Sequence, residues 1–167
     1  TSEIEAVGFA DRSNVIRVKL LEQQRAQTIA LSGTSGGDNH SVYVHVEENA
    51  FVDYAGNPNI RAYDIVPEEV PDTVPPKVTA AAIDYTTGIV RITVDEFVDS
   101  TPETRVDLSK ILGVQATGDN IPPDATVFTG ASVTETDGLI LQITLTEAQR
   151  VSAVRNSNTN GGYTAGG

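Results

Sequence analysis

Residues 138–162 repeat residues 13–37 at an offset of 125 positions, and this internal repeat constrains the fold more than any other feature of the chain. Identical residues occupy four matching pairs of positions: Leu20/Leu145, Glu22/Glu147, Gln24/Gln149 and Arg25/Arg150. The match continues without a gap from Ser32-x-Thr34-x-Gly36-Gly37 to Ser157-x-Thr159-x-Gly161-Gly162. A repeat of domain length indicates a tandem array of modules. The 167 residues then hold the later part of one module and the earlier part of the next.

Short segments with period-two alternation dominate the rest of the sequence. Apolar and polar residues alternate over residues 16–20, 42–46, 90–94 and 141–145. Each pattern predicts a half-buried strand with its apolar residues on one face. Turn-forming residues separate these segments, as in Gly56-Asn57-Pro58 and Asp137-Gly138. The arrangement predicts an all-β fold of antiparallel β-sandwich modules.

Each copy of the repeat also contains one segment with helical composition. Residues 146–154 are rich in Ala, Glu, Gln and Arg, which favour helices, and the counterpart is residues 21–30. Thr144 and Glu147 have the spacing of a capping box. We therefore expect a short helix near one end of each module, with its charged residues on a solvated face.

A proline-rich segment lies between the two parts of the repeat. Residues 67–76 contain four prolines, which a central strand excludes because proline has no N–H for the ladder. This composition predicts an extended, stiff linker. The expected organisation is the C-terminal part of one sandwich module over residues 1–66, a junction over 67–76, and the N-terminal part of the next module over 77–167.

The charge of the chain limits its partners. The formal net charge is −12, and such a surface repels nucleic acid, which requires basic residues for binding. No apolar run is long enough to span a membrane, so no membrane insertion of this segment is expected. The chain has no Cys, which excludes a disulfide framework and thiolate chemistry. No cofactor is predicted apart from a possible Ca²⁺, which acidic oxygen ligands favour.

Two acidic groups are the candidate calcium ligands. Their members are Glu68, Glu69 and Asp72 at the junction, and Asp95, Glu96 and Asp99 after a predicted strand. No EF-hand spacing is present, and the alternative interpretation is a solvated acidic surface. No nucleophile motif is present either, and the paired carboxylates lie in turns and a linker, so we expect no enzyme activity.

Three other features concern the loops. Asn39-His-Ser41 is an N-glycosylation sequon in a segment rich in Gly and Ser, which makes Asn39 a candidate acceptor. His40 and His45 are expected to be exposed, since a zinc site requires more ligands than these two. Asp53 can accept hydrogen bonds from nearby N–H groups, and Gly56 and Asn57 tolerate positive φ, which predicts a structural turn.

Three motifs give the chain a family resemblance. They are Asp72-Thr-Val-Pro-Pro-Lys-Val, Gly88-Ile-Val-Arg-Ile-Thr-Val-Asp-Glu-Phe-Val-Asp99 and Asn49-Ala-Phe-Val-Asp-Tyr-Ala-Gly-Asn-Pro58. They resemble the opening segment, the strand segment and the closing turn of bacterial-type Ig-like modules in large repetitive surface proteins and adhesins. Here the closing motif precedes the opening motif, as expected for a chain that includes a junction. The resemblance implies a structural or adhesive role and no catalysis.

Two functions follow as expectations. The first is a structural subunit or segment of an extracellular fibre, stalk or surface appendage. The alternative is a calcium-dependent adhesin module that binds glycan or protein through its loops. In either case the partners are neighbouring copies of the same module, joined covalently or assembled head to tail by strand addition. The expected location is extracellular or at the cell surface.

Overall fold

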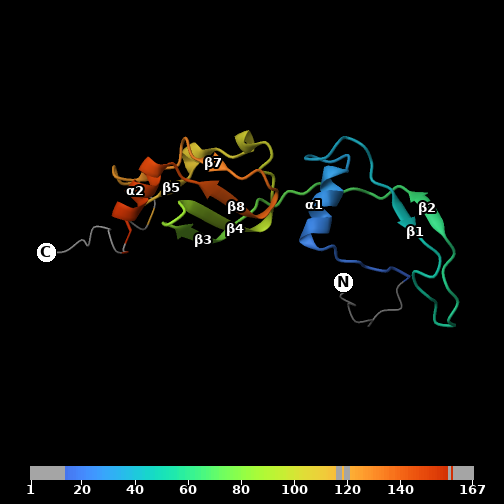
Figure 1. Cartoon of the computed structure of the whole chain (residues 1–167). Coiled ribbons are helices and arrows are strands. Elements are labelled where there is room, and N and C mark those ends of the chain that lie inside the picture. The colour runs from blue at the N-terminus through green and yellow to red at the C-terminus, as the bar shows by residue number, and fades with distance from the viewer. Residues whose placement is uncertain (1–13, 116–117, 119–120, 158, 160–167) are drawn as a thin grey trace. The chain divides into compact units, whose positions relative to one another are not determined.

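The computed structural model describes residues 14–115, 118, 121–157 and 159 of the chain. The chain divides between Pro75 and Pro76, within the proline-rich segment, into two compact units. Over the described residues the regular structure is mostly antiparallel strand, together with two α-helices of nine residues each (Figure 1). The prediction of a β-rich fold is confirmed at this level. Both helices fall short of the length and hydropathy needed to cross a bilayer.

Unit 1 has little regular structure and little buried surface. Its described elements are α1 (Glu22–Ala30), β1 (Val44–Val46) and β2 (Ala62–Ile65). The two strands form an antiparallel pair in which Val44 lies opposite Ile65. Among the described residues of unit 1 only Ser32 is buried, so this part of the chain has no apolar core of its own.

Unit 2 is built on a four-stranded antiparallel sheet with the strand order β3-β4-β8-β7. The strands are β3 (Val78–Asp84), β4 (Ile89–Val98), β7 (Ser132–Val133) and β8 (Gly138–Thr144). The alternation that predicted β4 matches its burial, because Val90 and Val94 are buried whereas Arg91 is exposed. This is the expected result for a strand with one face on the core.

The described part of unit 2 contains five further elements. They are the 3₁₀ helices η1 (Glu103–Arg105) and η2 (Leu108–Lys110), the short pair β5 (Leu112–Gly113) and β6 (Thr126–Val127), and α2 (Glu147–Arg155). The apolar core lies between these elements and the sheet, and Ile143 is fully buried at its centre. Its other buried members are Val90, Phe128, Leu145 and Ala153.

The two copies of the repeat differ at the strand that precedes the helix. Residues 138–144 form β8, whereas the described part of the corresponding segment, residues 14–19, forms neither strand nor helix. Val18 is 65% exposed and its counterpart Ile143 is 0% exposed; Leu20 is 45% exposed and Leu145 7%. The prediction of a strand at residues 16–20 is therefore wrong. The physical reason is that β8 lies between β4 and β7, and the described part of unit 1 supplies no counterpart of β4.

The two helices begin at equivalent positions of the repeat. The residues that cap α2 are not the pair expected from the sequence. In α2 the N-cap is Thr146, whose Oγ1 accepts from the N–H of Gln149 at 3.3 Å. Gln149 Oε1 in turn accepts from the Thr146 N–H at 2.9 Å, which completes a capping box at Thr146 and Gln149 instead of Thr144 and Glu147. Thr144 is the last residue of β8, and its backbone therefore belongs to the sheet.

Candidate functional site

The helix and the turn after it recur with the same internal contacts in both units. Ser32 Oγ donates to Ile29 O at 2.8 Å, and its counterpart Ser157 donates to Val154 O at 2.7 Å. Each serine hydroxyl also contacts the threonine hydroxyl two residues later, at 2.7 Å and 2.6 Å respectively. Both serines are buried. The sequence repeat is therefore also a repeat of local structure over the described residues.

An arginine on each helix forms the same bidentate ion pair with the glutamate three positions before it. Arg25 Nε and Nη2 each lie 2.7 Å from a carboxylate oxygen of Glu22, and the corresponding distances between Arg150 and Glu147 are 2.8 Å and 2.7 Å. Such paired N–H···O contacts fix the plane of the guanidinium group. The pKa of Glu147 lies below its ordinary value, chiefly because its carboxylate accepts hydrogen bonds from Arg150.

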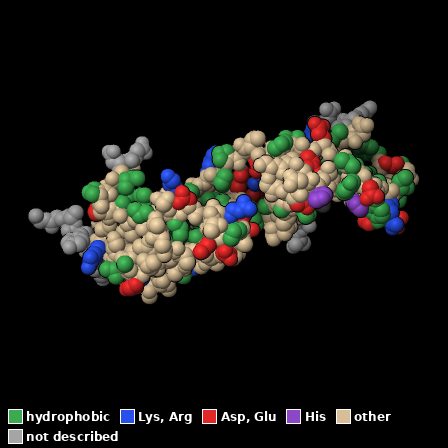
Figure 2. All heavy atoms as spheres, turned by 90° about the horizontal axis from the view of Figure 1, so that it is seen from above, with side chains coloured by type: hydrophobic (Ala, Val, Ile, Leu, Met, Phe, Trp, Pro, Cys, Tyr) green, Lys and Arg blue, Asp and Glu red, His purple; other side chains and the backbone are tan. Residues whose placement is uncertain are grey.

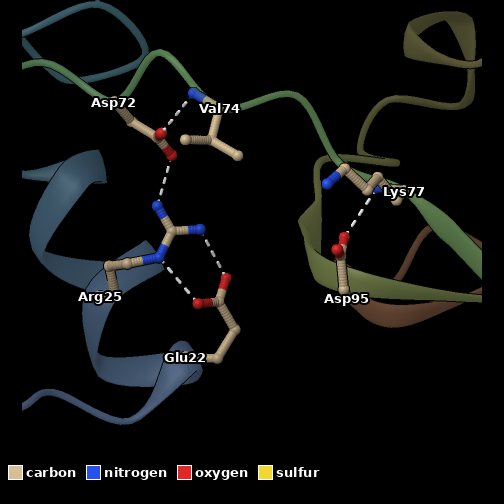
Figure 3. Close-up of polar contacts among 6 residues, drawn as sticks. All are labelled: Glu22, Arg25, Asp72, Val74, Lys77 and Asp95. Carbon is tan, nitrogen blue, oxygen red and sulfur yellow. Dashed lines mark hydrogen bonds and ion pairs between the residues drawn. The ribbon is translucent and has the colours of Figure 1, made fainter.

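The third contact of the arginine differs between the copies. Arg25 Nη1 forms an ion pair with Asp72 of the proline-rich linker (Figure 3). Arg150 Nη1 instead donates to the carbonyl oxygen of Tyr85, at the turn between β3 and β4, at 2.8 Å. The arginine at this repeat position therefore connects the helix to a segment distant in sequence, which is the outgoing linker in unit 1 and the first hairpin in unit 2.

Two carboxylates fasten the linker to unit 1. Asp72 Oδ1 accepts from the N–H of Val74 at 3.0 Å, and this bond, followed by the contact with Arg25, lowers the pKa of Asp72. Glu69 Oε2 accepts from the N–H of Gly33 at 2.8 Å, and its Oε1 accepts from the N–H of Val42 at 2.6 Å. The linker thus crosses the segment after α1 and is hydrogen-bonded to it at two separate residues.

The second acidic group lies on unit 2. Asp95 Oδ1 accepts from the N–H of Lys77 at 2.7 Å, where the linker enters β3 (Figure 3). Asp99 Oδ1 accepts from the Thr101 N–H at 3.1 Å, and its Oδ2 lies 3.3 Å from Arg105 Nη1. Of the other candidate calcium ligands, Glu68 is exposed and Glu96 is half-buried. Within the described part of the chain no three acidic or histidine side chains are placed to hold one metal ion.

The loop residues singled out from the sequence lie at the surface. Asn39 is exposed, with a φ of 69°. The side chain of His40 is 83% exposed and lies 3.4 Å from Asp38, whereas His45 lies 3.4 Å from Asp64. Histidine side chains are visible on the surface in Figure 2. The prediction that both histidines are exposed is confirmed.

The Asp53 turn closes a loop in unit 1 through a single carboxylate. Asp53 Oδ1 accepts from the N–H groups of Ala55 at 2.9 Å and Asn57 at 2.8 Å, and its Oδ2 accepts from Asn57 Nδ2 at 2.9 Å. These bonds favour the ionised form, so the pKa of Asp53 is lowered, with the Asn57 side chain as the largest cause. Gly56 adopts the positive φ of the turn, 84°.

An apolar groove in unit 2 is a feature that sequence patterns did not predict. It has a volume of about 280 Å³ and lies between the β3–β4 face of the sheet, β5, β6 and α2. Its lining includes Ala81, Ile83, Ile92, Ile111, Phe128 and Ala153. The groove is open because β3 is an edge strand whose residues 78–82 are all exposed. Small residues on this strand were the only sequence signal for it.

Comparisons with known protein families, with curated proteins and with solved structures give no match to this chain. The features of the described residues that bear on function are the internal repeat, the fastened linker and the exposed apolar surfaces.

Proposed function

We propose that this chain is a structural segment of an extracellular fibre, stalk or surface appendage built from tandem Ig-like β-sandwich modules. The observation that supports this proposal is the recurrence of one helix, its arginine–glutamate pair and its Ser–Thr turn 125 positions apart, in two separate units. Duplicated local structure at domain spacing is the expected property of a module array.

The linker contacts support a mechanical role for the junction. Three prolines of the segment, Pro67, Pro71 and Pro75, belong to unit 1. Between them, Glu69 and Asp72 hold the chain against the helix and the following loop. A proline-rich linker is stiff, and hydrogen bonds to its side chains limit rotation about its backbone further. Such restriction suits a rod that sets spacing at a cell surface.

The surface chemistry supports the same role. The net charge of −12 keeps a long array soluble and discourages binding to nucleic acid. The carboxylates of Asp53, Glu69, Asp72 and Asp95 accept hydrogen bonds from backbone N–H groups, which is a structural use of acidic residues. We propose no catalytic step for this segment.

The test of this proposal is the mass and location of the native polypeptide. An antibody raised against this chain is used on denatured extracts of the source cells, and on intact cells before and after surface proteolysis. The proposal expects a band far above 17.7 kDa that disappears when intact cells are treated with protease. A band near 17.7 kDa that resists the protease would refute both the array and its location.

A further inference from the structure

The loop between α1 and β1 carries the N-glycosylation sequon Asn39-His40-Ser41, and all three of its residues are exposed. The backbone forms neither helix nor strand at these positions. An enzyme that transfers a glycan must reach both the acceptor asparagine and the hydroxyl two residues later, so a sequon that is used lies on a surface loop. The structure meets this requirement at Asn39.

The amide of Asn39 has no structural use within the described part of the chain. By contrast, the amides of Asn57, Asn59 and Asn156 each donate a hydrogen bond to an oxygen of another residue, at 2.9, 2.8 and 2.9 Å. Neither the Asn39 amide nor the Ser41 hydroxyl forms such a bond with any described residue. The φ of 69° explains why an asparagine is tolerated here, but it does not explain the serine two positions later.

Other groups fix the loop that carries the sequon. Glu69 of the linker accepts from the N–H of Gly33 at 2.8 Å and from the N–H of Val42 at 2.6 Å, so one carboxylate closes the loop at both ends. Between these ends, Asp38 Oδ1 accepts from the N–H of His40 at 2.9 Å. None of these bonds uses a side chain of the sequon. A glycan can therefore be added without breaking them.

We propose that Asn39 carries an N-linked oligosaccharide and that this glycan covers the linker beside Glu69. The transfer joins the side-chain nitrogen of Asn39 to C1 of the first sugar of an oligosaccharide carried on a lipid pyrophosphate. The bond from C1 to the pyrophosphate oxygen breaks, the nitrogen loses one proton, and the lipid pyrophosphate leaves with the bonding electron pair. This inference rests on the proposed function, because an exported chain is the one that meets such a donor.

The position of the sequon gives the glycan its role at the junction. Glu68 and Val70 are exposed, and residues 66–77 form neither strand nor helix. Exposed backbone of this kind is a preferred site of proteolytic cleavage. A bulky glycan on the loop that Glu69 closes stands beside these peptide bonds and hinders the approach of a protease.

The first experiment maps the native polypeptide by mass spectrometry. Cleavage by trypsin and a glutamate-specific protease yields residues 26–47, in which Asn39 is the single asparagine. Peptide N-glycanase in heavy-oxygen water then converts a glycosylated asparagine into a heavy-labelled aspartate. The proposal expects this label at Asn39. It expects none at Asn49, which is also exposed, with a φ of 64°, but has no serine or threonine two residues later.

Matched variants identify the acceptor. Secreted from a host that transfers such oligosaccharides, the 167-residue chain should carry one glycan, which peptide N-glycanase removes. Asn39→Gln and Ser41→Ala should each abolish the glycan, whereas Asn49→Gln is the control and should retain it. Far-UV circular dichroism checks that the three variants retain the fold. A secreted, unaltered chain without a glycan, or a glycan that survives in Asn39→Gln, would overturn the assignment.

Proteolysis tests the covering of the linker. The glutamate-specific protease should cut after Glu68 or Glu69 several-fold more slowly in the glycosylated chain than in the enzymatically deglycosylated chain, and Asn39→Gln should match the latter. Equal rates would overturn the role at the junction. A native polypeptide with an unmodified Asn39 would overturn the proposal even where its mass and location fit the proposed function, so the two can fail separately.

Discussion

Truncation of two repeat-equivalent residues, Ile143→Ala and Val18→Ala, should have very different effects on stability. Ile143 is fully buried against Val90, Phe128 and Leu145. Its loss of three carbon atoms removes roughly 2.4 kcal/mol of transfer free energy at about 0.8 kcal/mol per group. The cavity left behind raises the loss to about 3–4 kcal/mol. Val18 is 65% exposed, so its truncation should change the free energy of unfolding by less than about 0.5 kcal/mol.

The assay is urea-induced unfolding followed by far-UV circular dichroism at low protein concentration. We expect the Ile143→Ala midpoint to fall with little change in the m-value, which identifies lost stability and not altered compactness. In thermal unfolding the same loss corresponds to a decrease in Tm of at least roughly 10 °C for a unit of this size. Equal losses for the two variants would refute the reasoning, because they would mean that residues 14–19 are buried as β8 is.

The remaining predictions concern protons, a glycine and calcium. The pKa of Asp53 in the folded chain lies below its ordinary value because the turn donates hydrogen bonds to its carboxylate, so its stabilising effect is present above the ordinary pKa and is lost as the pH falls through the folded value; Asp53→Asn should therefore lower Tm at pH 7, and this decrease should shrink as the pH is lowered through the acid range, whereas a decrease that does not change with pH would contradict this. Gly37→Ala should distort the turn after α1, because the new Cβ would lie 2.0 Å from Ser32 O, whereas Gly33→Ala has its nearest atom at 3.5 Å; circular dichroism and Tm of both variants test the difference. Because the Glu69 carboxylate already accepts two backbone hydrogen bonds, we expect Ca²⁺ to leave Tm unchanged relative to a chelator; a rise would instead favour the calcium-dependent adhesin.

Local patterns predicted the elements that local physics controls. The alternation around Val90 and Ile143 indicated the two central strands of the unit 2 sheet, and both residues are buried there. Helix-favouring residues indicated α1 and α2 to within about one residue at each end. The identity of Glu22 and Arg25 with their repeat counterparts was visible in the sequence, and so the matching ion pairs have a sequence basis.

Contacts between residues that are distant in sequence could not be predicted from these local patterns. The alternation over residues 16–20 predicted a strand, but a strand also requires a neighbour, and that requirement is not encoded in the segment itself. The partners of Glu69 and Asp72 lie 27 to 47 positions away, and a proline-rich segment has no periodicity that indicates which face approaches the protein. The groove was not predictable either, because it depends on how β3, β5 and α2 pack.

The Glu69–Val42 bond has a consequence for the chain under tension. It joins two points 27 positions apart, so a pull along the polypeptide can pass from Val42 to Glu69 without extending the segment between them. That segment contains the entire β1–β2 hairpin and the Asp53 turn. Once the bond and the hairpin open, about 90 Å of slack chain becomes available at roughly 3.4 Å per residue. Breaking the hydrogen bond of the Glu69 carboxylate thus allows residues 42–69 to extend. Under load the chain would lengthen by this segment before any covalent bond of the backbone is strained.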